Sequence, residues 1–137
     1  MSINNIHILF LWILTLCLSL VNITRGIAAE TDIPDYMLTR EHIYEYTFSD
    51  TTQAARIIEL MRERKLAPKY ELDIAQGDLL FNNGRYNPAL FYYKTALQSD
   101  SVQCDDEKQM EQLHRMISCY DGLHDEKMKT IYTHWRN

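Results

Sequence analysis

The sequence predicts an all-α fold, an antiparallel array of helix-turn-helix units. Within residues 70–101, small and aromatic residues recur at the spacing that lets two antiparallel helices pack closely. The segment 82–85, Asn-Asn-Gly-Arg, lies in the middle of this stretch and tolerates the positive φ angles that reverse a chain. Apolar residues recur at helical spacing on both sides, around 54–61 and 113–123. These observations predict one clear helix pair with further helices flanking it.

The chain begins with an apolar leader. Residues 8–21 form a run of 14 without a charge, which is short for a bilayer crossing but typical of the apolar region of a secretory signal peptide. Gly26 and Ala28 would place small side chains at the recognition positions for cleavage after Ala28. No Lys or Arg precedes the run. We interpret residues 1–28 as a signal peptide, with an uncleaved membrane anchor and a start codon placed upstream of the true one as alternatives.

Residues 29–50 are expected to be a weakly ordered lead-in. Within it, the stretch 36–46 predicts a short, weakly amphipathic helix, and residues 47–50 offer side chains that can cap the next helix. Four apolar residues then follow at the i, i+3, i+4, i+7 spacing of one helix face: Ala54, Ile57, Ile58 and Met61. We predict a helix over about 51–65, ended by Leu66-Ala67-Pro68, at the start of a helical domain over 51–137.

The central helix pair carries small and aromatic residues at defined offsets. With Tyr70 as the first position, the predicted packing residues are Gly77, Leu80, Tyr86, Ala89, Tyr93 and Ala96. Gly77 and Ala89 allow the helices to approach, and Pro88 falls in the first turn of the second helix, where proline is tolerated. The pattern resembles a tetratricopeptide repeat, with Leu80 in place of a usual Tyr and Asp73 where a large apolar residue is common. The resemblance implies a protein-binding unit.

Downstream of this pair the pattern is weaker. Residues 100–107 are expected to be a polar, acidic link, followed by apolar residues at helical spacing: Leu113, Met116, Ile117, Tyr120 and Leu123. This predicts a second, degraded repeat in which Ile117 and Lys129 occupy places for small residues, and whose second helix holds Asn137. About three such repeats are usually needed to bury their apolar faces. We expect the open ends to be covered by the helix from Thr51, a second copy of the chain or further repeats.

Composition and charge exclude several classes of function. The net charge of −5 becomes −6 without Arg25, the one charged residue of 1–28, and the only basic patch, 62–69, is interrupted by Glu63 and Pro68. This argues against nucleic acid as a partner. The chain has no phosphate-binding glycine loop or nucleophile motif, so we expect neither an enzyme nor a cofactor. A membrane would be contacted only through residues 1–28, if they are uncleaved.

Histidine and cysteine side chains do not predict a metal site. His114, Cys119 and His124 are five residues apart on a predicted helix, so they cannot converge on one ion. Cys104 and Cys119 are either a disulfide pair in an oxidising compartment or two free thiols in a reducing one. Cys119 lies beside Tyr120 on the helix, which favours simple core packing.

A few residues of the central pair are candidates for partner binding. Tyr86 and Tyr93 are explained by packing, which leaves Phe91 and Tyr92 as aromatic contacts for a partner. Polar side chains that could line a groove for a carboxylate are Lys69, Asn82 and Arg85. A solvated surface is the alternative interpretation of both sets.

These segments, taken in order, resemble the amino-terminal region of one protein family, the seventh subunit of the anaphase-promoting complex. The similarity extends over about 51–129 and rests on the segments 56–60, 69–70, 77–97 and 115–127. It implies a non-catalytic, nuclear scaffold in a cell-cycle ubiquitin ligase, with protein partners and self-association. That family is several times longer and has no secretory signal. If the leader is genuine, the chain belongs to the secretory pathway, and the alternative function is a small secreted or membrane-tethered adaptor that binds a protein or peptide.

Overall fold

The computed structural model describes residue 13 and residues 33–137. The signal-peptide, anchor and start-codon interpretations of 1–28, and Cys17, lie outside the described residues. None of the helices in the described part is both long enough and apolar enough to span a membrane.

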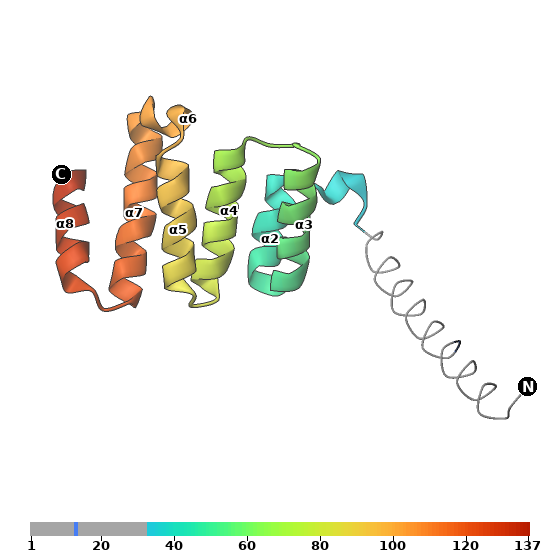
Figure 1. Ribbon diagram of the computed structural model, residues 1–137, viewed down its shortest axis with the longest axis horizontal. Coiled ribbons are helices and arrows are strands. Elements are labelled where there is room, and N and C mark those ends of the chain that lie inside the picture. The colour runs from blue at the N-terminus through green and yellow to red at the C-terminus, as the bar shows by residue number, and fades with distance from the viewer. Residues whose placement is uncertain (1–12, 14–32) are drawn as a thin grey trace, which may run out of the picture. The chain divides into compact units, whose positions relative to one another are not determined.

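Residues 34–137 are all-α, as predicted, without a strand in this part of the chain. A short 3-10 turn, η1 (Asp35–Met37), is followed by seven helices: α2 (Arg40–Ser49), α3 (Thr51–Glu63), α4 (Lys69–Asn82), α5 (Tyr86–Leu97), α6 (Asp100–Gln103), α7 (Asp106–Gly122) and α8 (Glu126–Arg136). The long helices form three consecutive antiparallel pairs, α2/α3, α4/α5 and α7/α8, with α6 in the connection between α5 and α7 (Figure 1).

Helix α2 overlaps the short, weakly amphipathic helix that the sequence predicts over 36–46 within the weakly ordered lead-in, and it ends three residues later. It is a full helix that packs against α3 and α4, and the helical unit begins at Pro34, earlier than the expected 51. The Thr39 hydroxyl caps its start by accepting from the amide of His42, while Asp50 caps α3. The amphipathic pattern of α2 is weak because only Ile43 and Thr47 are buried, and the Thr47 hydroxyl donates to the carbonyl of Ile43 at 2.7 Å.

Three of the long helices end in the same way. The predicted turn after α4 is confirmed: Gly84 has a φ of 70°, and the Arg85 amide donates to the Leu80 carbonyl at 2.9 Å. Lys65 after α3 and His124 after α7 take the same left-handed conformation, with φ of 54° and 55°. This is the Schellman arrangement, which satisfies carbonyls at a helix end. The sequence did not predict it at Lys65 or His124, because the conformation favours glycine.

The central pair packs through the predicted residues. Ala89, Tyr93 and Ala96 are fully buried, and the Tyr93 ring covers Gly77, where a Cβ atom would lie 2.7 Å from its Cδ1. The Tyr86 ring also lies on a glycine, but that glycine is Gly122 of α7, where a Cβ would lie 2.7 Å from its Cζ. Tyr86 therefore joins the α4/α5 pair to α7, a role that the offsets within one repeat do not predict.

The unexpected residue of the central pair, Asp73, has a structural role. Its side chain is buried, and its carboxylate accepts from Arg62 at 2.9 Å and from Lys69 at 2.5 Å. Two cations compensate the cost of burying this charge. Asp73 thus joins α3 to α4 at a position where tetratricopeptide repeats often carry an apolar residue.

The downstream part is more helical than expected. The predicted polar link contains α6, whose Val102 is fully buried, and Asp105 caps α7 by accepting from the Lys108 amide. Helix α8 packs on α7 with Met128 and Tyr132 against the core, and Tyr132 stacks on Tyr120 with ring centroids 5.3 Å apart. No side chain of α8 is fully buried, and Trp135 is exposed.

The contact between Gly77 and Tyr93 predicts the effect of a larger residue. Gly77→Leu should push α4 and α5 apart and lower the free energy of unfolding by about 1 to 3 kcal/mol or more through overpacking. Chemical denaturation of the full chain measures this change. Gln76→Leu, at a half-exposed neighbouring position, is the control and should change stability little. Unchanged stability in Gly77→Leu would contradict the packing described here.

Candidate binding groove

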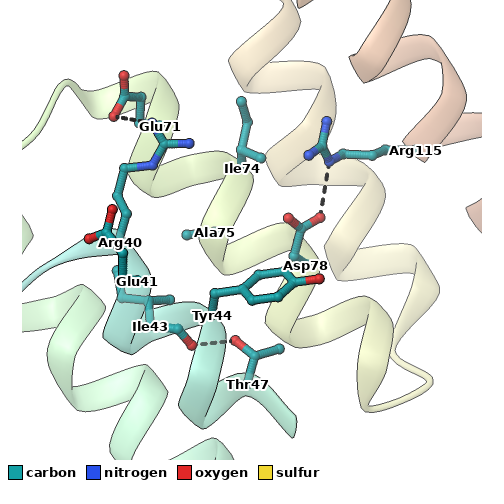
Figure 2. Close-up of a pocket in the computed structure, with 10 residues that line it drawn as sticks. All are labelled: Arg40, Glu41, Ile43, Tyr44, Thr47, Glu71, Ile74, Ala75, Asp78 and Arg115. Atoms are coloured by element: carbon teal, nitrogen blue, oxygen red, sulfur yellow. Dashed lines mark hydrogen bonds and ion pairs between the residues drawn. The ribbon is translucent and has the colours of Figure 1, made fainter.

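The side chains of α2, α4 and α7 line an open groove. An open pocket of about 640 Å³ and an adjoining pocket of about 280 Å³ share four lining residues: Tyr44, Thr47, Asp78 and Arg115. We therefore treat the two as one feature and call it the α2–α4–α7 groove. Figure 2 shows its larger part, with side chains from α2 on one side and Arg115 of α7 on the other.

Helix α2 gives the groove an apolar floor and an aromatic rim. Ile43 and Thr47 are one turn apart and buried, so they form part of the floor. Tyr44 and Phe48 follow them by one residue each and are 67% and 65% exposed. Their rings meet edge to face with centroids 5.4 Å apart. Two large aromatic side chains thus lie at the rim without being covered by residues 33–137.

Helix α4 supplies two acidic groups to the groove, two turns apart. Glu71 accepts from Arg40 of α2 at 3.2 Å and from the hydroxyl of Tyr70 at 3.1 Å. Asp78 lies two turns further along α4, beyond the apolar Ile74 (Figure 2). The spacing of 71, 74 and 78 keeps all three on one face of the helix. Arg40 of the α2/α3 pair is therefore bound by Glu71 of the α4/α5 pair.

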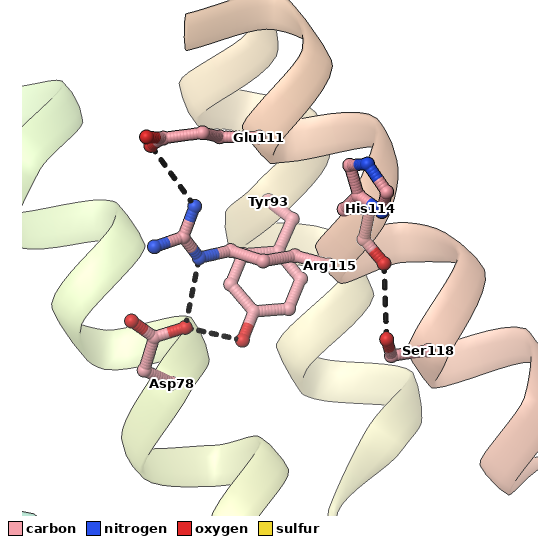
Figure 3. Close-up of polar contacts among 6 residues, drawn as sticks. All are labelled: Asp78, Tyr93, Glu111, His114, Arg115 and Ser118. Atoms are coloured by element: carbon pink, nitrogen blue, oxygen red, sulfur yellow. Dashed lines mark hydrogen bonds and ion pairs between the residues drawn. The ribbon is translucent and has the colours of Figure 1, made fainter. Parts of the chain in front are cut away.

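Asp78 is the centre of a polar network between three helices. Its Oδ1 accepts from the Tyr93 hydroxyl of α5 at 2.7 Å and from Arg115 Nε of α7 at 3.1 Å (Figure 3). Arg115 also lies 3.5 Å from a carboxylate oxygen of Glu111. Burial, together with the negative charge of Asp78, raises the pKa of Tyr93 well above its ordinary range, so the hydroxyl stays a neutral donor.

One atom of this network remains available. Asp78 Oδ2 has no hydrogen-bond partner among the residues that the structure describes, and the Asp78 side chain is 31% exposed in the groove. Tyr93 and Arg115 hold the carboxylate in place. Chemically, the arrangement can accept a hydrogen bond or an ion pair from a bound molecule without first reorganising the groove.

The predicted aromatic contacts lie elsewhere. Tyr92 lines a different pocket, of about 460 Å³, formed with residues of α3 and with Gln76 of α4. Phe91 is exposed and meets Tyr92 edge to face at 5.4 Å. This pocket shares no lining residue with the α2–α4–α7 groove.

The three polar residues suggested for a carboxylate site do not come together. Lys69 begins α4 and pairs with Asp73, whereas Asn82 ends the helix and lines the groove. The helical rise places these two residues about 20 Å apart. Arg85 lies beyond the turn, just before α5. A joint groove for one carboxylate is therefore ruled out for these side chains.

Both cysteines of residues 33–137 are free thiols. Cys104 is exposed after α6, and Cys119 is fully buried between α5 and α7. Burial, with a smaller effect of Asp78, raises the pKa of Cys119 to about 12. Its place in the core agrees with the packing interpretation. Within the described part, no three His, Cys, Asp or Glu side chains gather in a way that could hold a metal ion.

Sequence reasoning missed the main residues of the groove. Tyr44 and Phe48 lie on a helix that was expected to be weak, and Asp78 meets Arg115 across 37 residues of sequence. The spacing of 71, 74 and 78 on one face of α4 was the available signal, but nothing in the sequence says that α2 and α7 lie beside that face.

Compared with models of protein families, with curated proteins and with solved structures, the chain matches none of them.

The pKa of Cys119 predicts sensitivity to alkali. A thiol whose pKa rises from 9.0 to about 12 on folding favours the folded state fully below pH 9, and this stabilisation is lost as the pH rises toward 12. The free energy of unfolding should therefore fall above pH 9. Cys119→Ala removes the titrating group and should reduce this fall, although the variant is less stable at neutral pH. Denaturation of both proteins across this pH range measures the difference, and equal slopes would contradict the expectation.

Proposed function

We propose that the protein is a non-catalytic protein-binding module whose α2–α4–α7 groove takes up a segment of a partner polypeptide. The observation that carries the proposal is the exposed pair of Tyr44 and Phe48 at the rim of the groove, where Tyr44 lines both pockets and Phe48 lines the adjoining pocket of about 280 Å³. Aromatic side chains contribute large apolar area at protein interfaces and are enriched there. A bound segment would cover both rings.

The ion pairs within the groove support the same function. Ion pairs between the helices hold Arg40 with Glu71 and Asp78 with Arg115. Because these groups are already positioned, binding a partner orders few additional side chains, and less of the interaction free energy is lost to conformational entropy. A smaller loss of conformational entropy favours tight binding of a partner.

The resemblance seen in the sequence agrees with this proposal. Tetratricopeptide repeats bind proteins, and the resemblance to the seventh subunit of the anaphase-promoting complex implies a scaffold with protein partners, including further copies of itself. The secreted or membrane-tethered adaptor is the alternative setting. Both assign protein binding to the helix pairs, and they differ in the compartment and in the partner.

Peptide selection tests the proposal. Peptides selected from a random library against the full chain should bind in the groove, so their affinity, measured by fluorescence anisotropy, should fall about tenfold or more in the double variant Tyr44→Ala/Phe48→Ala. Phe91→Ala is the matched control, because Phe91 is an equally exposed aromatic residue outside the groove. Equal binding to the double variant, or a dependence on Phe91 instead, would count against the groove.

A further inference from the structure

Building on the proposed function, we infer that the α2–α4–α7 groove selects a basic partner segment. Such a segment places a Lys or Arg side chain against Asp78 and packs apolar neighbours on Tyr44 and Phe48. The inference depends on which charges of the groove are already paired and which remain available.

The two arginines of the groove are engaged within the protein. Arg40 pairs with Glu71, and Arg115 pairs with Asp78 and lies near Glu111. An acidic partner would have to draw one of these guanidinium groups away from its carboxylate. It would also bring negative charge toward a protein whose net charge is −5. The groove therefore disfavours an acidic segment.

The groove has more carboxylate groups than arginine side chains. Four carboxylates line the groove or pair with its arginines: Glu41, Glu71, Asp78 and Glu111. Glu41 is exposed and makes no ion pair with the described residues, although hydrogen bonds from its own amide and from Thr39 lower the pKa of its carboxyl group. The Oδ2 atom of Asp78 is without a partner among the described residues. With two guanidinium groups against four carboxylates, the groove carries net negative charge and retains a free acceptor at Asp78.

The surroundings of Asp78 suit a cation on an apolar segment. Tyr44 lines both parts of the groove together with Asp78, so its ring offers a face on which a guanidinium or ammonium group can lie. Phe48 and Phe81 line the adjoining pocket and can receive apolar neighbours of that cation. The matching partner is thus both basic and apolar.

Three peptide pools test this selectivity. Each pool consists of labelled short peptides with randomised apolar flanks around a fixed central residue, which is Arg, Gln or Glu. On the full chain we expect the Arg pool to bind about tenfold more tightly than the Gln pool, with the Glu pool weakest, since a charged hydrogen bond is gained or lost. High salt should reduce the advantage of the Arg pool.

Two groove variants and one control assign the effect. Asp78→Asn keeps an oxygen that can accept from Tyr93 and Arg115 but removes the charge, so it should abolish the advantage of Arg over Gln. If Asp78→Asn folds poorly, Glu41→Gln tests the selectivity instead, because this exposed side chain makes no ion pair with the described residues. Loss of its charge should reduce the advantage of Arg over Gln in part. Glu59→Gln removes the same charge from α3, outside the groove, and should leave the advantage unchanged.

The outcomes separate this inference from the proposed function. If the three pools bind equally, or if the Glu pool is tightest, while binding still depends on Tyr44 and Phe48, the charge selectivity is wrong and the groove remains a binding site. An advantage of Arg that persists in a folded Asp78→Asn variant, or that is undiminished in Glu41→Gln, also overturns the selectivity. If binding does not depend on Tyr44 and Phe48, the proposed function itself fails.

Discussion

The position of Tyr93 is the constraint on which the rest of the structure depends. Its ring lies on Gly77, which fixes the distance between α4 and α5, and its hydroxyl donates to Asp78. Asp78 in turn accepts from Arg115, which links α7, packed against α5, to α4. One side chain thus sets both the apolar packing of the central pair and the geometry of the polar groups that face the groove.

A tyrosine ring packed on a glycine also joins the central pair to α7. The Tyr86 ring lies on Gly122 of α7, so a ring on a glycine again determines how closely two helices approach. On the other side, the buried carboxylate of Asp73 accepts from Arg62 of α3. The central pair is therefore joined to α3 on one side and to α7 on the other. These contacts determine the shape of the groove, because α2, α4 and α7 all line it.

The sequence predicts what depends on local spacing. The all-α fold and helix α3 follow from apolar residues at helical spacing, and the buried Ala89 and Tyr93 follow from the offsets of small and aromatic residues within 70–101. In place of α2 the sequence predicts only a short, weakly amphipathic helix over 36–46, because the few buried side chains of α2 leave a weak periodic pattern. It does not predict the meeting of Asp78 with Arg115, which depends on how helix pairs stack. Gln112 is another feature that the sequence does not predict. It is fully buried, and its side-chain amide has no hydrogen-bond partner among the described residues.

A double-mutant cycle on Tyr93→Phe and Arg115→Gln tests most directly whether Asp78 couples the three helices. Both side chains donate to the same oxygen, so the change in the free energy of unfolding of the double variant should differ from the sum of the single changes by about 0.5 to 3 kcal/mol. Denaturation of the four proteins gives this value. Strictly additive changes would mean that the two hydrogen bonds act independently, and would contradict the central role of Asp78.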